Sequence, residues 1–431
     1  MLDSMTQARR FILQVWLSVG SEKLSPPEQL PIVLQVLLSQ IHRLRALDLL
    51  GRFLNLGPWA VNLALSVGIF PYILKLLQSC ARDLRPPLVF IWAKILAVDM
   101  SCQVDLVRDN GHRYFLSVLS DTSMPAERRT MAAFVMSCIV CNHPSGQEAA
   151  LKGNVIALCT EQLQDGHARL RQWLALCLGR TWHGYSAARW CGIRDSAHEK
   201  LYSLLTDPVP EVRAAAVFAL GTILNCPAKR TDHADTIDHG IGMHLASTVA
   251  NDGSPVVRKE LVVSLQWLLF VFETQFTAMA YQYFEEESTK AEVAQPAPKH
   301  LLNAPDLNLS PMKRVASRER LNRLLPIPAN ILSGTVVEGF PEPAPVVTPA
   351  SPAQPERMRR VSSSTSISSI GGPLGVGTSF SGSTLGLSCI YNQVWRILVA
   401  LGTDPHPQVA SMAKSLVQAF KAKALSNLES K

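Results

Sequence analysis

An all-α, helical-repeat solenoid interrupted by a long disordered insertion is the fold class that the sequence predicts. Three observations support this prediction. Hydrophobic residues make up 47% of the 431 residues and charged residues 17%, so the chain can bury a large core. A motif of aspartate, arginine and an apolar helix recurs at nearly constant spacing. Between these repeats, residues 286–388 are rich in proline, serine and glycine, a composition typical of disorder.

Each copy of the repeated motif has an aspartate, an arginine six residues later, and then a run of apolar residues. The copies are Asp165–Arg171, Asp207–Arg213 and Asp252–Arg258, and a fourth copy, Asp404–Ala410, lacks the arginine. In all four copies, the positions three and seven residues after the arginine position are apolar. That spacing is one face of a helix. Neighbouring positions are apolar as well, so we expect each helix to be sandwiched between others.

The spacing of the motif indicates the type of repeat. Asp165 and Asp207 are 42 residues apart, Asp207 and Asp252 are 45 apart, and Asp121 precedes Asp165 by 44. Armadillo and HEAT units recur at about 40–47 residues. Asp121 leads into a helix expected over 124–140 in a looser register, and a further helix, expected over 196–205, precedes Asp207. The sequence therefore predicts an armadillo/HEAT-type stack over residues 1–285.

The predicted insertion, residues 286–388, interrupts the stack without ending it. It contains 13 of the 28 prolines. Asp252 and Asp404 are 152 residues apart; without the insertion the separation is about one repeat. We therefore expect residues 389–425 to continue the solenoid, with helices over 391–402 and 406–425.

The recurring charges allow two interpretations. In the structural one, each aspartate occupies the helix N-cap or the turn before it, and the arginines form a ladder of ion pairs between stacked repeats. In the functional one, the charges line an edge that contacts a partner. The candidates for such an edge are Asp165, Asp207, Arg213, Asp252 and Arg258.

Three serines of the insertion have an arginine three residues before them: Ser317, Ser362 and Ser363. Ser317 and Ser363 also have apolar residues at positions −5 and +4, which is similar to the preference of the AMP-activated protein kinase. A phosphate would add roughly −1.5 to −2 charges and could recruit an arginine-lined reader. Arg-x-x-Ser also occurs by chance, so a phosphorylation site and a chance match both remain open as interpretations.

No motif indicates catalysis. Cys138 and Cys141, with His143 nearby, resemble half of a zinc site, but no second pair has matching spacing, so we expect core thiols. Nucleophile elbows, phosphate-binding glycine loops and dinucleotide fingerprints are absent from the sequence. We therefore predict no catalytic residue, metal or cofactor, and a binding scaffold in place of an enzyme.

Charge and hydropathy exclude two further classes of function. The net charge of +7 is dispersed along the chain, so we expect no nucleic-acid partner. The longest apolar run, 261–272, is too short for a membrane span of about 20 residues. The nine scattered cysteines are typical of a reducing, intracellular environment.

Long blocks of the chain resemble the central armadillo/HEAT region of the Raptor family, the regulatory-associated proteins of the target of rapamycin (TOR) kinase. One block is ARWCGIRDSAHEKLYSLLTDPVPEVR, residues 188–213. The others are 30–79, 90–99, 105–119 and 253–263. In the insertion, MRRVSS (358–363) resembles the family's regulatory MRRASS-like segment.

The resemblance implies a non-catalytic scaffold of the rapamycin-sensitive TOR complex, in nutrient and growth signalling. It implies binding to the TOR kinase and the Rag GTPases, and a cytoplasmic location with recruitment to the lysosomal surface. It also implies phosphorylation of the linker by the AMP-activated protein kinase, foremost at Ser363, followed by 14-3-3 binding. Substrates carrying a TOR signalling motif are a further implied partner.

Two departures bear on substrate capture. The family's caspase-like domain and C-terminal propeller lie outside this sequence, and substrates in the family bind surfaces shared with the caspase-like domain. In CNHPSGQEA (141–149), His143 stands where the family has a tyrosine, so an apolar anchor contact is expected to be weaker. Alternatives are a truncated competitor of the full-length scaffold, and a karyopherin-like transport receptor, which would bind basic cargo.

Overall fold

The computed structural model describes residues 30–31, 36–37, 39–79, 81–225, 231–293 and 384–429, and these residues form helices and connecting loops. The α-helices are α3 (Arg43–Leu54), α4 (Pro58–Ser66), α5 (Phe70–Leu76), α6 (Arg85–Leu96), α7 (Gln103–Arg108), α8 (His112–Ser120), α9 (Ala126–Ile139), α10 (Pro144–Lys152), α11 (Val155–Glu161), α12 (Ala168–Trp182), α13 (Ser186–Arg194), α14 (Ala197–Tyr202), α15 (Pro210–Leu224), α16 (Asp232–Thr248), α17 (Pro255–Val271), α18 (Glu273–Val293), α19 (Thr384–Leu401) and α20 (Pro407–Glu429). The expected all-α fold is confirmed.

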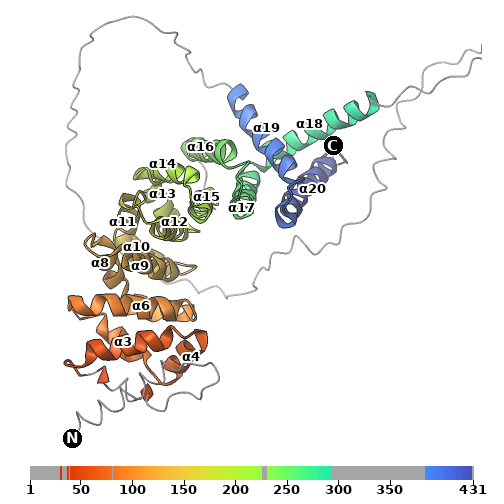
Figure 1. Ribbon diagram of the computed structural model, residues 1–431. Helices are drawn as coiled ribbons and strands as arrows, with labels where there is room; N and C mark the ends of the chain where they lie inside the picture. The colour runs from red at the N-terminus through yellow and green to blue at the C-terminus, as the bar shows by residue number, and fades with distance from the viewer. Residues whose placement is uncertain are drawn as a thin grey trace, which may run out of the picture. The chain divides into compact units, whose positions relative to one another are not determined.

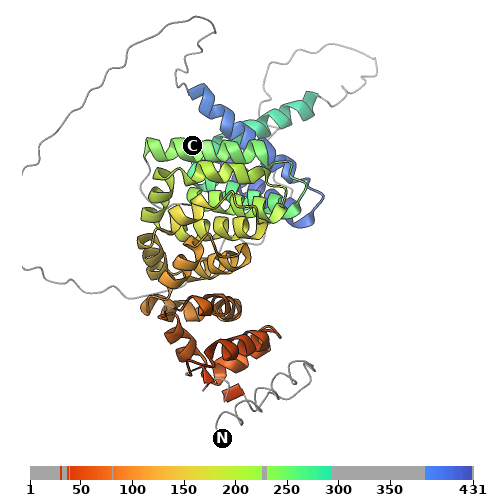
Figure 2. The same cartoon turned by 60° about the vertical axis from the view of Figure 1, so that its left-hand side comes forward.

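The helices stack in chain order (Figures 1 and 2). The helices that follow the motif aspartates, together with α6, form one row. In this row α6 contacts α9, α9 contacts α12, α12 contacts α15, α15 contacts α17 and α17 contacts α20. The helices that precede the aspartates form a second row, in which α16 contacts α19. Each unit therefore completes its core only against its neighbours, as in helical-repeat proteins.

The apolar positions of the repeated motif form the core of the stack. Leu174, Ala216, Leu261 and Ala413 are fully buried, at 0% exposure. Along α15 nearly every residue after the first turn is buried, including Val217 and Leu220. This helix lies between α12 and α17 and touches both, which is why its sequence is apolar around most of its circumference.

Two glycines allow the helices of this row to approach closely. An added Cβ at Gly179 of α12 would lie 2.8 Å from the Phe218 ring and 3.0 Å from the Ala219 Cα on α15. At Gly221 of α15 it would lie against the Ser264 side chain of α17. Close packing between neighbouring repeats therefore explains both glycines, and α12 continues past Gly179 to Trp182.

Helices α18 and α19 extend beyond the boundaries predicted for the insertion. Residues 286–293 continue α18 and residues 384–388 begin α19. Glutamate, lysine and alanine favour helix after residue 285, and Pro296 is the first proline that follows. Residues 294–383, including Ser317, Ser362 and Ser363, lie outside the described residues, so the predicted disorder of the insertion stays a prediction.

We predict that Gly221→Ala lowers the free energy of unfolding by about 1–3 kcal/mol, because the new methyl group forces α15 and α17 apart. Gly240→Ala is the matched control, since an added Cβ there meets no atom within 4 Å. This control substitution within α16 should raise stability, by up to about 1 kcal/mol, through helix propensity. Urea unfolding of the two variants measures the difference, and equal effects would contradict the close packing.

Candidate functional site

A ladder of ion pairs runs between successive repeats. In each rung, an arginine at the start of one helix reaches the aspartate in the loop before the corresponding helix of the next repeat. The rungs are Arg85–Asp121 at 3.5 Å, Arg129–Asp165 at 2.9 Å, Arg171–Asp207 at 2.8 Å, Arg213–Asp252 at 2.6 Å and Arg258–Asp404 at 2.6 Å. The structural interpretation of the motif therefore holds for these pairs.

The aspartates lie in the turn before the helix, and not at the N-cap. One carboxylate oxygen accepts a hydrogen bond from the backbone N–H two residues later, as Asp252 does from Ser254 at 2.8 Å. Asp207 accepts from Val209 and Asp404 from His406 in the same way. This Asx turn leaves the second oxygen free to receive the arginine of the preceding repeat.

Arginines of the later rungs join two turns at once. Arg213 Nη1 donates to the backbone carbonyl of Asp207 in its own repeat at 2.7 Å, while its Nε and Nη2 donate to Asp252 of the next repeat. Arg258 repeats this arrangement with Asp252 and Asp404. The planar guanidinium provides these donors in fixed directions, which a lysine ammonium cannot do.

The ladder favours the ionised form of the Asp252 and Asp404 carboxylates. Burial raises the pKa of Asp252, but hydrogen bonds from Arg213 and the Ser254 N–H outweigh it and bring the pKa below its usual value. The hydrogen bond from Arg258 holds the pKa of Asp404 below its usual value, against the opposing effect of burial. The side chains of Asp252 and Asp404 are 7% and 4% exposed, so little of either carboxylate reaches solvent.

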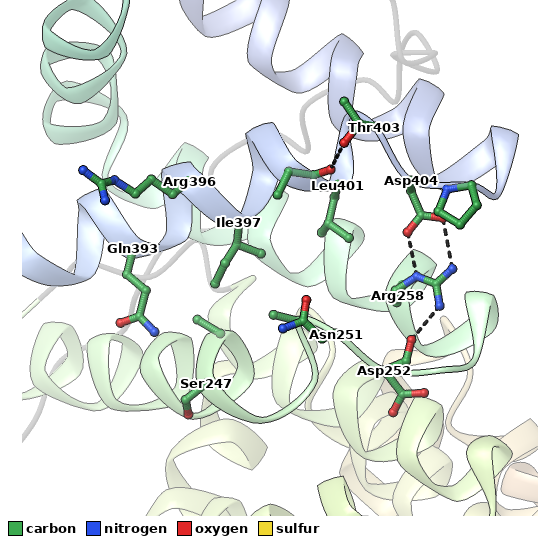
Figure 3. A pocket seen from close by; sticks show the side chains of 14 residues that line it. Ser247, Asn251, Asp252, Arg258, Gln393, Arg396, Ile397, Leu401, Thr403 and Asp404 are labelled. Carbon is green, nitrogen blue, oxygen red and sulfur yellow. Dashed lines mark hydrogen bonds and ion pairs between the residues drawn. The ribbon is translucent and has the colours of Figure 1, made fainter. Parts of the chain in front are cut away.

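The last rung crosses the insertion. Arg258 and Asp404 are 146 residues apart in sequence, and Figure 3 shows the guanidinium between Asp404 and the backbone of Asp252. On the other row of helices, His239 of α16 and Tyr391 of α19 are 2.7 Å apart, Nε2 to hydroxyl. Phe276 packs edge-on against Tyr391. Polar and aromatic contacts thus attach α19 and α20 to the helices that precede the insertion.

The residues predicted to line a partner-binding edge have structural partners in this ladder. Asp165, Asp207, Arg213, Asp252 and Arg258 all belong to its rungs. A contact of their loops with another protein stays a prediction. His143 lies apart from the ladder, in the residue before α10. It is partly buried, and its Nδ1 has no hydrogen-bond partner among the described residues.

Cys138 is buried, and burial raises the pKa of its thiol to about 11. Cys141 is partly buried. Within the part of the chain that the structure describes, no group of three or more His, Cys, Asp or Glu side chains could hold a metal ion.

Sequence reasoning missed Arg129 and Arg85 as members of the ladder. Arg129 lies eight residues after Asp121, and not six, because the loop before α9 is longer. Its Nε donates to the Met124 carbonyl at 3.2 Å, while Nη2 reaches Asp165. A search that allowed variable loop length after Asp121 would have found this rung.

No single helix of the described residues is long and apolar enough to cross a membrane. Two pairs of consecutive helices, α4 with α5 and α17 with α18, are long and apolar enough only when both helices of the pair are counted. The first pair is bent by 94° and the second by 105° at the break.

Comparison with known proteins adds to this geometry. The HEAT repeat family model matches residues 199–226, which include the Asp207 turn. The Raptor homologue of Dictyostelium discoideum is 43% identical over 410 residues, covering 95% of this chain and 23% of that protein. Along 95% of its length, the chain is homologous to a part of this Raptor protein.

Two further proteins are similar to the chain. A subunit of target of rapamycin complex 1 from Schizosaccharomyces pombe, mip1, is 49% identical over 275 residues, covering 62% of this chain and 21% of that protein. The crystal structure of Chaetomium thermophilum Raptor superposes with a TM-score of 0.71 at 32% identity, covering 98% of this chain and 32% of the Raptor chain. The chain thus spans between a fifth and a third of the length of these three proteins.

We predict that Asp252→Ala lowers the free energy of unfolding by about 2–4 kcal/mol, since it leaves the Arg213 guanidinium and the Ser254 N–H without their acceptor. Glu148→Ala is the control, because it removes an exposed ion pair with Lys152 within α10. Thermal unfolding should show a lower Tm for the first variant and an unchanged Tm for the second. If Asp252→Ala kept the Tm but lost a partner, the partner-edge interpretation would be preferred.

Stability should fall on acidification, because Asp252 and Asp404 have lowered pKa values in the folded chain. A group with a lowered folded pKa stabilises the fold above its unfolded pKa, near 3.9, and that contribution is lost as the pH falls below it. Asp404→Asn retains an acceptor for the His406 N–H but carries no charge. Urea unfolding between pH 6 and 3 should therefore show a smaller decrease in the free energy of unfolding for Asp404→Asn than for the unchanged chain. Parallel curves would contradict the ionised Asp404 carboxylate as a source of the pH dependence.

Proposed function

We propose that the chain is a non-catalytic scaffold segment of target of rapamycin complex 1 that binds the TOR kinase through its helical repeats. The observation that carries this proposal is the 49% identity over 275 residues to a named subunit of that complex in Schizosaccharomyces pombe. The relation to Raptor proteins along 95% of the chain supports the same role.

The physical character of the chain also supports a scaffold. Its core is continuous from repeat to repeat, and guanidinium groups fix consecutive turns relative to one another. Helical-repeat proteins present long surfaces whose shape follows from the rotation between repeats. Such a surface can bind a large partner by many separate contacts, without the preorganised polar constellation that catalysis needs.

Further partners belong to the same proposal. Rag GTPases would dock on the repeats and bring the cytoplasmic chain to the lysosomal surface. The AMP-activated protein kinase would phosphorylate the insertion, foremost at Ser363, with Ser362 and Ser317 as the other candidates, and 14-3-3 proteins would read the phosphate. The support for this regulation is the MRRVSS segment with its arginines at position −3.

Substrates with a TOR signalling motif are the least supported partner. The family resemblance assigns them a groove that includes the caspase-like domain, and His143 replaces an aromatic tyrosine in the segment that would line it. A His143→Tyr variant would restore the aromatic anchor and serves as the matched comparison for substrate binding.

The test is affinity capture of the tagged full chain from cell lysate, read by mass spectrometry. The proposal predicts that the TOR kinase is recovered with the chain. Asp252→Ala should lower this recovery only by the fraction of the chain that the substitution unfolds. Failure to recover the kinase with the folded chain would contradict the scaffold role.

The same capture after energy stress tests the regulation separately. Phosphate on Ser363, with 14-3-3 proteins recovered, supports it, and Ser363→Ala should abolish both signals. Recovery of the kinase together with a reduced amount of full-length Raptor in the complex would favour the competitor alternative.

A further inference from the structure

The two helices that follow the insertion pack as one hairpin on the helices that precede it. Helices α19 and α20 contact each other, α19 also contacts α16 and α18, and α20 contacts α17 and α18 (Figure 1). We call the surface formed by α16, α17 and α18 the hairpin face, and its boundary with the hairpin the seam. Residues 384–429 therefore complete the core at this end of the stack as a single unit.

Aromatic rings make up much of the apolar contact at the seam. Trp395 of α19 is 1% exposed, and its ring meets Phe284 of α18 edge-on, with 6.3 Å between the ring centroids. Phe420 of α20 stacks with Phe270 of α17 at 6.4 Å. Phe276 of α18 is fully buried against the hairpin. A chain without a hairpin on this face would expose large apolar rings to water, which is unfavourable.

Opposite charges match the hairpin to its face. Arg258 before the insertion pairs with Asp404 after it, and Glu273 of α18 pairs with Lys423 of α20. In each pair one partner belongs to the face and the other to the hairpin. Complementary charges discriminate between partners, because a wrong partner leaves a charge unpaired. The face is therefore specific for this hairpin.

The length of the connection distinguishes the hairpin from the other repeats. From α12 to α18, consecutive helices are joined by at most seven residues, as by residues 225–231 between α15 and α16. Residues 294–383, which join α18 to α19, are 90 residues. Fully extended, a segment of that length would reach about 300 Å. Short loops thus force the earlier repeats to pack within one chain, whereas the hairpin can reach the hairpin face of a second copy.

We propose that two copies of the chain exchange their hairpins, so that residues 384–429 of each copy pack on α16, α17 and α18 of the other. Every contact at the seam is kept in this dimer, because the same residues meet. The last rung then joins Arg258 of one copy to Asp404 of the partner subunit. The exchange does not rest on the proposed role in the TOR complex, because it follows from the seam alone.

Concentration decides between the closed monomer and the exchanged dimer. Both forms have the same contacts at the seam, so they differ mainly in how the hairpin is supplied. A tether that follows the predicted disorder of the insertion holds the chain's own hairpin at an effective concentration of at most about 1 mM. We therefore expect exchange when concentrated chains refold together, and more of it when the closed monomer is disfavoured.

The test uses two full-length variants that each break the last rung within one chain. Arg258→Asp gives the rung two acidic side chains, and Asp404→Arg gives it two basic ones. Neither variant can form the rung as a closed monomer or as a dimer of its own kind. Exchange between the two variants places opposite charges at both seams, so only the mixed dimer forms both ion pairs.

Equal amounts of the two variants, one labelled with ¹⁵N, are unfolded together in urea and refolded by dilution at about 0.1 mM. Size-exclusion chromatography with light scattering measures the dimer, and native mass spectrometry identifies its two chains. We expect a mixed dimer at least tenfold more abundant than the dimer of either variant refolded alone, as for a preference of about 1.4 kcal/mol.

Two controls locate the exchange at the seam. Arg213→Asp and Asp252→Arg break a rung whose two residues both precede the insertion. A mixture of these two variants should therefore give no excess of mixed dimer. A single chain that carries both Arg258→Asp and Asp404→Arg has opposite charges at its own seam. It should refold as a monomer with a Tm close to that of the unchanged chain.

A second pair of variants keeps the test decisive if a change at the last rung prevents folding. Glu273→Lys and Lys423→Glu reverse the exposed ion pair of the seam and leave Arg258 and Asp404 in place. Absence of an excess of mixed dimer from both seam pairs would overturn the proposal. An equal excess from the Arg213 and Asp252 variants would overturn it as well. Because purified chains are used, these outcomes are independent of whether the TOR kinase is captured from a lysate.

Discussion

The stack depends on guanidinium groups that each hold two consecutive turns. The apolar faces of the helices provide the greater part of the stabilisation, but hydrophobic contact is not directional and fixes neither the rotation nor the register of one repeat on the next. Arg171, Arg213 and Arg258 add that direction, because each bonds the backbone of its own turn and the carboxylate of the following one. We infer that the ladder sets the geometry between repeats, whereas burial of the helices sets their stability.

The sequence was sufficient to predict the helical repeats and most of the ladder. Both depend on local spacing: an aspartate six residues before an arginine, and apolar residues three and seven positions further on. The pairing of Arg213 with Asp252 follows from the repeat period, because each arginine must meet the next copy of the turn. Arg129 escaped this reasoning because a longer loop displaces it from the expected position.

A groove between the end of α16 and the second half of α19 (Figure 3) could not have been found from the sequence. Its walls come from residues 246–252 and 393–405, which the insertion separates, and only packing brings them together. Small residues such as Ala246 and Ala250 line this open space. Nothing in the local sequence distinguishes them from small residues on a buried helix face. The helix ends at Val293 and Thr384 also differ from the predicted boundaries, because composition marks where proline and serine accumulate and not where helical hydrogen bonding stops.

The claim that the stack continues across the insertion is tested most directly by a double-mutant cycle on Arg258 and Asp404. Unfolding free energies would be measured in urea for Arg258→Ala, Asp404→Ala and the double variant. The account predicts a coupling energy of about 1–3 kcal/mol between the two residues, as for side chains in direct contact. A coupling energy near zero would contradict it, because the helices that follow the insertion would then not depend on the ladder that precedes it.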